Sequence, residues 1–511
     1  RFNQCGCRPF ALDANTTGVQ NVALGYEAGS TSTTTHDITA IGHQTLSLNT
    51  GSANTALGSE AFEANSTASY GTAVGASALK ANTTGGNNTA VGRNAMLVNT
   101  TGAGNVAVGA GALDANTTAH YNTAVGSQAL SANTTGASNV GVGKSALAAN
   151  TTAANNTAVG YLALTANTTG AGSVAIGTSA LATNTTTSNN TAIGSYALTA
   201  NTTGALNISV GGYSLDANTT GGSNTAVGQN ALSANTTASY NVAVGADSLL
   251  LNTTGAANTA IGWAALDANT DGIDSVAVGY QALTANTTAA NNTAVGSAAL
   301  AANTTGGTNT AVGYNALAAL TSGAGNTAIG YQAMKGAEGA TSSDYNIAIG
   351  QKALYSIGTG DWNIAIGNKA AEAELGSYML YIAYDKEASD GTLIKGDMYN
   401  KFLAIGKADV TLTTEDATLQ VYPTGHVAAY FAKMPGSHTG DLIRIENSSG
   451  TNLFLVDKDG DITVKIKFSN GTMTHNTIAN PFWSKDKGFV AVDEERCNRV
   501  HPWVLLRVVQ K

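Results

Sequence analysis

Residues 88–104 read NTAVGRNAMLVNTTGAG, residues 122–138 read NTAVGSQALSANTTGAS, and residues 292–308 read NTAVGSAALAANTTGGT. They share the consensus NTAVGxxALxANTTGxx, in which we number the first Asn position 1 and the last residue position 17. The glycine of NTAVG recurs in steps of 17 residues from Gly58 to Gly330. A fixed internal period of this kind is the signature of a stacked repeat architecture.

Further copies extend the repeat in both directions. They start at residues 21, 38, 326, 346 and 363, and residues 4–20 (QCGCRPFALDANTTGVQ) fit as a degenerate first copy. We therefore predict a solenoid of about 22 coils over residues 4–377. Residues 378–440 are expected to form a β-rich neck, and residues 441–511 a C-terminal β-stalk or tip.

The residues of the repeat favour strands over helices. Gly, Asn and Thr at fixed places are poor helix formers, and the alternation in NTAVG is typical of a short strand. We expect the branched residues at positions 2 and 4 to face inward and the Ala at position 3 to face outward. The apolar pair at positions 8 and 9, such as Ala129-Leu130, fits either a second strand or a single helical turn. The predicted fold is an all-β, repetitive β-solenoid, on the order of 100 Å long for 22 coils.

Polar residues at fixed positions predict how the coils are joined. Identical amides stacked at position 12 can form a hydrogen-bonded ladder, and the following Thr-Thr-Gly is expected to form a corner in which Gly takes a positive φ. We assign a structural ladder to residues at position 12 and at the NTAVG glycine: Asn65, Asn82, Asn99, Asn116, Asn133, Gly75, Gly92 and Gly109.

The composition predicts self-association. Each coil offers only about three large apolar side chains, which is a small core for a solitary solenoid. The expected flat face of Ala residues would let chains approach closely and would protect the strand edges, so we predict a homotrimer.

The repeat resembles the head repeats of trimeric autotransporter adhesins, which carry a strand similar to Ser173-Val174-Ala175-Ile176-Gly177. The longer unit with the ANTTG corner looks like repeats of bacteriophage tail fibres. The resemblance covers roughly residues 4–377 and implies a parallel trimer of left-handed β-rolls. Residues 390–422 look like the segment that follows such repeats in phage-type fibres, and residues 440–464 look like the β-stalk before a C-terminal chaperone domain. An extracellular, cell-surface or virion location is implied.

Composition also argues against several classes of function. The net charge of −9 is dispersed, which disfavours nucleic-acid binding. No stretch approaches the ~20 apolar residues of a membrane span. The chain starts at Arg1 with no hydrophobic signal region, so we expect a mature form, a trimmed form or a fragment. No cofactor is expected.

Four groups of residues are candidates for metal binding, disulfide formation or modification. Cys5 and Cys7 fall at positions 2 and 4, where core packing is favoured over an interchain disulfide or a metal site. Asp457, Asp459 and Asp461 form a weak calcium candidate, but the Asp-Gly between two apolar strands favours a hairpin turn. The repeated Asn-Thr-Thr matches a glycosylation acceptor, although the ladder explains it without glycans. The histidines, among them His36, His43 and His120, show no metal spacing.

We expect a noncatalytic structural fibre for surface display or adhesion, with a cell-surface glycan or protein receptor as a possible partner. The alternatives are an end-to-end polymerised filament or sheath and an ice- or glycan-binding solenoid. A polysaccharide depolymerase is disfavoured because the carboxylates at position 10 recur singly: Asp13, Asp114, Asp216 and Asp267. Positions 6, 7, 10, 16 and 17 vary and should face outward; their larger side chains include Tyr26, Tyr161, Tyr280, Tyr314, Trp263, Arg93 and Lys144.

Overall fold

The computed structural model describes residues 10–336, 342–373, 376–384 and 392–399, together with the backbone of the remaining strands. The chain divides into two units, which we describe separately. The first unit comprises residues 1–361 and 372–375, and the second comprises residues 362–371 and 376–511.

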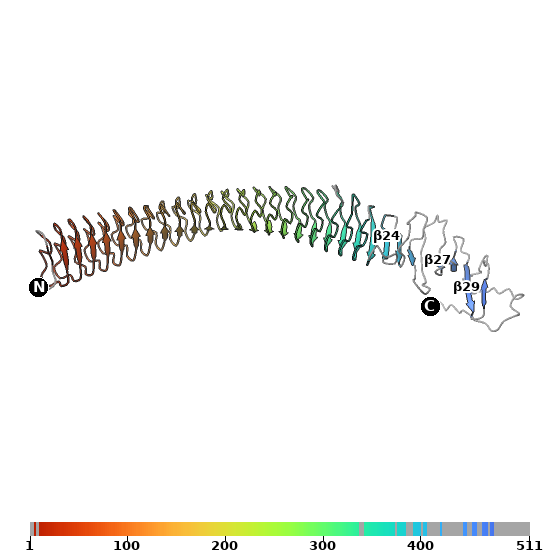
Figure 1. Ribbon diagram of the computed structural model, residues 1–511, viewed down its shortest axis with the longest axis horizontal. Helices are drawn as coiled ribbons and strands as arrows, with labels where there is room; N and C mark the ends of the chain where they lie inside the picture. The colour runs from red at the N-terminus through yellow and green to blue at the C-terminus, as the bar shows by residue number, and fades with distance from the viewer. Residues whose placement is uncertain are drawn as a thin grey trace, which may run out of the picture. The chain divides into compact units, whose positions relative to one another are not determined.

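The first unit is a parallel β-solenoid. Each coil contributes one three-residue strand at positions 2–4, and each strand pairs in register with that of the next coil, as in Thr157↔Val174, Ala158↔Ala175 and Val159↔Ile176. The coils follow one another in a single row (Figure 1). The predicted all-β solenoid of ~17-residue coils is confirmed, with about 21 turns in the chain and no helix among the residues described.

The strands of the first unit are β1 (Cys5–Gly6), β2 (Val22–Leu24), β3 (Thr39–Ile41), β4 (Thr55–Leu57), β5 (Thr72–Val74), β6 (Thr89–Val91), β7 (Val106–Val108), β8 (Thr123–Val125), β9 (Val140–Val142), β10 (Thr157–Val159), β11 (Val174–Ile176), β12 (Thr191–Ile193), β13 (Ile208–Val210), β14 (Thr225–Val227), β15 (Val242–Val244), β16 (Thr259–Ile261), β17 (Val276–Val278), β18 (Thr293–Val295), β19 (Thr310–Val312), β20 (Thr327–Ile329) and β21 (Ile347–Ile349).

The interior of each coil is thin, and this reverses the predicted orientation of the strands. The residue at position 3 faces inward and is fully buried, while positions 2 and 4 face outward. Side chains at positions 3 and 8 touch across the coil: the hydroxyl groups of Ser209 and Ser214 lie 2.5 Å apart, and the Ser209 hydroxyl also donates to the Ser214 backbone carbonyl at 2.8 Å. A Cβ added to Gly141 at position 3 would lie 3.3 Å from the Ala146 carbonyl oxygen. A branched side chain does not fit there, so the prediction of an inward branched face and an outward Ala face is wrong.

Two buried ladders of Asn side chains join the coils. At position 12, Asn116 Nδ2 donates to Asn99 Oδ1 at 2.6 Å and to the Ala119 carbonyl at 3.2 Å. At position 1, the Asn122 backbone N–H donates to Asn105 Oδ1 at 2.8 Å, a second ladder that we did not assign from the sequence. Both sets of amides are fully buried. The position-12 ladder also contains bonds from Asn82 to Asn65 (3.5 Å), from Asn99 to Asn82 (2.6 Å) and from Asn133 to Asn116 (3.2 Å).

The glycine of NTAVG is required by close approach of the backbone. Gly109 has φ +141°, and a Cβ on it would lie 2.4 Å from the Gly126 carbonyl oxygen of the next coil. Gly75 and Gly92 are equivalent, with corresponding distances of 2.6 and 2.5 Å. A larger residue would force the two coils apart.

Most of the other positive φ angles fall on residues that are not glycine. The Gly of Thr-Thr-Gly, for example Gly102, does not have the positive φ that we predicted, and Ala119 occupies the same position in the next coil. Residues at positions 7, 9 and 17 have a positive φ instead. Leu130 at position 9 is fully buried with φ +53°, so the Ala129-Leu130 segment is a turn and neither a strand nor a helical turn.

The second unit contains two sets of strands. In the first set, β22 (Ile364–Ile366) pairs in parallel with β23 (Met379–Ala383), which is followed by antiparallel β24 (Thr392–Asp397) and β25 (Phe402–Ile405); β26 (Leu419–Val421) pairs in parallel with β25. The second set is an antiparallel sheet of β27 (Ile443–Glu446), β28 (Asn452–Val456), β29 (Ile462–Phe468) and β30 (Gly471–Thr474). Strands β28 and β29 pair as the predicted hairpin.

We expect that Asn116→Ala weakens the solenoid locally. The change removes two donated hydrogen bonds and the one accepted from Asn133, and a lost partner for a buried polar group costs about 1–3 kcal/mol. Amide hydrogen exchange of the flanking coils should be faster by the factor to which this loss of free energy corresponds. The matched control is Thr118→Ala, an exposed position of the same coil. Equal exchange in both variants would show that the ladder is dispensable.

Gly109→Ala and Gly111→Ala should differ strongly, although both glycines have a positive φ. A Cβ at Gly109 meets backbone at 2.4 Å, whereas the nearest atom to a Cβ at Gly111 is a side-chain oxygen at 3.7 Å. We expect Gly111→Ala to cost about 1 kcal/mol from backbone strain alone and Gly109→Ala to disrupt the coil stack. Chemical denaturation followed by circular dichroism measures both. Similar midpoints for the two variants would contradict the close-approach explanation.

Candidate interaction surfaces

An apolar surface runs along the strands of the first unit. We call it the outward strand face; it consists of the residues at positions 2 and 4 from β2 to β21. Position 4 is Val, Ile or Leu in every one of these strands, and position 2 is Thr, Val or Ile. Single side chains are well exposed, for example Ile261 at 40% and Val295 at 37%. No charged residue occurs in either row. The position-4 row is an unbroken line of aliphatic side chains, and contiguous exposed apolar surface marks interaction sites.

The outward orientation of positions 2 and 4 changes the interpretation of the N-terminal cysteines. Cys5 lies in β1 and pairs with Val22, so it stands at position 2, which faces outward in the coils that follow. The premise for core packing, that positions 2 and 4 point inward, is therefore wrong. The side chain of Cys5 and all of Cys7 lie outside the described residues, as do the calcium candidates Asp457, Asp459 and Asp461.

Exposed aromatic rings stack from coil to coil at the corner that follows the strand. At position 6, Trp263 stacks on Tyr280 with ring centroids 5.1 Å apart, and Tyr314 stacks on Tyr331 at 5.5 Å. These four rings are 46–53% exposed. The sequence indicated that position 6 faces outward, but only the in-register pairing of the strands brings residues 17 apart into contact. Other stacks join Tyr26 to His43 and, at position 7, Tyr196 to Tyr213.

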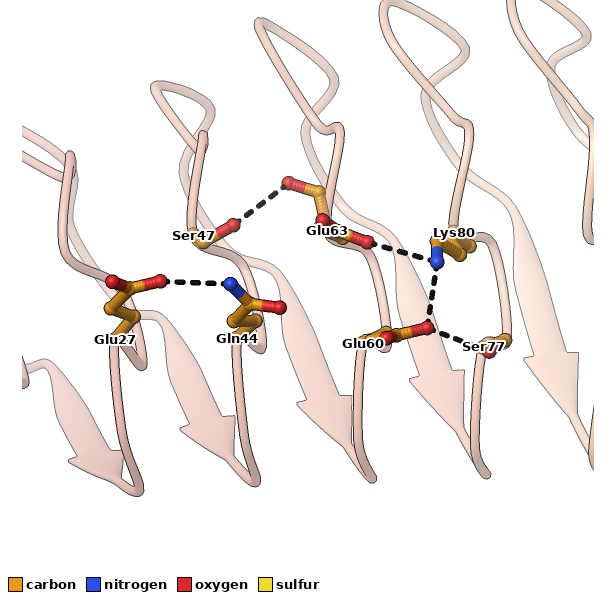
Figure 2. A network of polar contacts seen from close by, with 7 residues as sticks. All are labelled: Glu27, Gln44, Ser47, Glu60, Glu63, Ser77 and Lys80. Carbon is orange, nitrogen blue, oxygen red and sulfur yellow. Dashed lines mark hydrogen bonds and ion pairs between the residues drawn. The ribbon is translucent and has the colours of Figure 1, made fainter.

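A polar network lies near the N-terminal end of the solenoid (Figure 2). Lys80 donates to Glu60 at 2.7 Å and lies 3.3 Å from Glu63. The hydrogen bond from Lys80 lowers the pKa of Glu60, and the same bond raises the pKa of Lys80. Because both partners of the shorter ion pair are more than a third exposed, its contribution to stability is small.

The carboxylates of Asp13, Asp114, Asp216 and Asp267 at position 10 are bonded to backbone or hydroxyl groups and not to one another. Asp216 accepts a hydrogen bond from Ser233 and Asp267 accepts one from Thr284, both at 2.7 Å. Burial raises the pKa of Asp114, whose carboxyl group has no second acid beside it to form a catalytic pair among the contacts of the described coils.

The described part of the chain holds no group of three His, Cys, Asp or Glu side chains that could bind a metal ion. Two of the histidines serve as acceptors: the Nδ1 atoms of His36 and His120 receive backbone N–H groups of Val19 and Ala103. The Asn residues of the repeated Asn-Thr-Thr are buried in the position-12 ladder, so the folded coils do not present them for glycosylation.

Comparisons with known proteins add no relative. No protein-family model matches the chain, and no curated protein matches it. Within the described ranges, no helix is long and apolar enough to cross a membrane.

The pKa of Glu60 provides a direct test of the network. Because Lys80 stabilises the charged carboxylate, Glu60 should titrate below its ordinary value of 4.5, and Lys80→Gln should restore an ordinary pKa. The stabilisation is present at neutral pH and is lost as the pH falls through the lowered pKa of the folded state. Carboxyl chemical shifts in an NMR titration measure this. An unchanged Glu60 titration in Lys80→Gln would mean that the ion pair does not form in solution.

Proposed function

We propose that the chain is a subunit of a noncatalytic extracellular fibre, at a cell surface or on a virion, that mediates display or adhesion. The observation that carries the proposal is the uncharged outward strand face, which runs the length of the first unit. Its partner must match both the length and the coil spacing of this face. A second copy of the chain in parallel orientation meets both requirements, because its position-2 and position-4 rows have the same period.

A threefold assembly suits the two rows on each strand. Positions 2 and 4 are the first and last residues of the three-residue strand, and their side chains point to the same outer face. The two rows therefore run side by side, and in a closed ring one row can face one neighbouring chain while the other row faces the second. We therefore propose a homotrimer. This interface uses the branched residues and differs from the Ala-mediated contact expected from the sequence. Burial of the aliphatic position-4 row, and of the Val and Ile residues at position 2, would add the apolar area that the thin coil interior lacks.

The stiffness that the fold gives to the first unit supports a role as a spacer. Coils joined through strand hydrogen bonds, Asn ladders and close glycine contacts leave little freedom between neighbours, and at the usual strand spacing the first unit is on the order of 100 Å long. Such a body holds whatever it carries at a fixed distance from its attachment point.

The first test is solution mass, measured by analytical ultracentrifugation of the full chain and of the double variant Ile176→Lys, Ile193→Lys. Both side chains belong to the outward strand face and are 37–38% exposed, so the coil should fold while the apolar contact is broken. We expect a three-chain mass for the wild type and a lower mass for the variant. The control is Ala182→Lys, Thr199→Lys at position 10 of the same coils, where Lys80 shows that lysine is tolerated.

The other outcomes distinguish the alternatives. A wild-type monomer would reject the trimer. A monomer that also produces thermal hysteresis in freezing solutions would favour ice binding, because the Thr residues at position 2 face outward and not inward as expected from the sequence. Indefinite filaments in negative-stain microscopy would favour end-to-end polymerisation.

A further inference from the structure

Five consecutive coils carry an interrupted row of aromatic side chains at position 6. The order is Trp263, Tyr280, Ser297, Tyr314 and Tyr331. Strands β16 to β20 pair residue for residue, so these five positions follow one another at one coil spacing. The row is therefore two stacked aromatic pairs separated by a single serine.

The two inner rings form the walls of a slot. Within the pairs the ring planes are tilted by only 20° and 14°, so the stacked faces look along the direction in which the coils succeed one another. The uncovered faces of Tyr280 and Tyr314 then look toward the coil of Ser297 from opposite sides. We call the space between them the aromatic slot.

The width of the aromatic slot fits one six-membered ring. Two strand spacings separate its walls by about 10 Å. A ring placed midway would lie about 5 Å from each wall, which is within the range of favourable ring stacking. It is also close to the 5.1 and 5.5 Å that separate the rings inside the two pairs. A bound ring would occupy the place of the missing aromatic residue.

The backbone holds the walls and floor in place. Backbone N–H groups at position 7 donate to the carbonyls at position 6 of the preceding coil: Ala298 to Tyr280 at 2.8 Å, Asn315 to Ser297 at 3.0 Å, and Gln332 to Tyr314 at 2.8 Å. Each tyrosine is also packed against its stacking partner. The backbone spacing of the slot is therefore fixed before a ligand arrives, and each wall is restrained by its stacking partner, which lowers the entropic cost of binding.

The polar groups around the slot are neutral. The hydroxyl of Ser297 and the side-chain amides of Gln281 and Asn315 make no hydrogen bond to other described residues, and all three side chains are partly exposed. The three coils that form the slot, residues 275–325, contain no Asp, Glu, Lys, Arg or His. A charged ligand would find no counter-charge here, whereas a ring that carries hydroxyl groups would find donors and acceptors.

We infer that the aromatic slot binds one pyranose ring of a neutral saccharide. The apolar faces of the sugar would stack on Tyr280 and Tyr314, and its hydroxyl groups would bond to Ser297, Gln281 and Asn315. The inference deepens the proposed adhesive role by naming a ligand class. Every part of the slot comes from one chain, so its test does not depend on whether the trimer forms.

The experiment is saturation-transfer difference NMR on the full chain with a panel of neutral gluco-, galacto- and manno-oligosaccharides, compared with sialylated oligosaccharides and free indole. Ser297→Tyr fills the slot with the missing ring and should abolish binding without removing any contact of the fold. Tyr280→Ala removes one wall and should weaken binding roughly tenfold. The matched controls are Ser195→Tyr and Tyr161→Ala, which make the same changes at position 6 of coils without a slot.

The expected result is transfer to at least one neutral saccharide, lost in Ser297→Tyr and retained in both controls. Three results would overturn the inference: no transfer to any neutral saccharide, equal transfer in wild type and Ser297→Tyr, or transfer only to sialylated sugars or indole. Sedimentation of the same samples reports the assembly separately. A variant that loses sugar binding while its solution mass stays that of the wild type tests the slot alone. A wild-type mass other than three chains would contradict the proposed trimer and leave the slot inference untouched.

Discussion

The close approach of consecutive coils, held one strand spacing apart, is the constraint on which the other features of the solenoid depend. Every residue lies directly beside the equivalent residue of the next coil, so the side chain at each position must be able to pack against a side chain of the same or a similar type. Asparagine does so because its amide both donates and accepts, which gives the buried ladders at positions 1 and 12. The NTAVG glycine does so because it has no Cβ to meet the next carbonyl.

The same rule accounts for the low content of charged residues, 11%. Equal charges stacked from coil to coil would repel one another. Where acids occur near the N-terminal end, neutral side chains alternate with them at position 7: Gln44 donates to Glu27 at 2.9 Å, and Ser77 donates to Glu60 at 3.3 Å. Aromatic rings tolerate self-contact as well, because their faces stack at the coil spacing. A single Ser between two such stacks leaves a space of one ring.

Because the interior of each coil is thin, the candidate functional residues lie on the surface. Positions 3, 8 and 9 fill the inside of each coil with Ala and Leu, and the branched side chains are left on the outer side of the strand. The molecule thereby acquires two surfaces of different chemistry: a continuous uncharged face of Val, Ile, Leu and Thr that can pack against other copies, and a corner whose side chains vary from coil to coil. The first suits assembly and the second suits recognition, so one repeat can serve both roles without a pocket in its core.

The sequence by itself determined the period, the parallel stacking of strands, the recurrence of glycine after the strand and the amide ladder at position 12, because each follows from one residue type repeated at one spacing. It did not determine which side of the strand faces inward, since the alternation in Thr-Ala-Val is compatible with either the Ala or the two branched residues being buried. Only the distance across the coil decides this: the side chains of Ser209 and Ser214 are in contact, and a Cβ on Gly141 would already lie 3.3 Å from the Ala146 carbonyl oxygen, so position 3 takes a small side chain. The left-handed backbone of buried leucines such as Leu130 also needed the structure. Local preference disfavours that conformation for leucine, and the packing and hydrogen bonds of the neighbouring coils impose it.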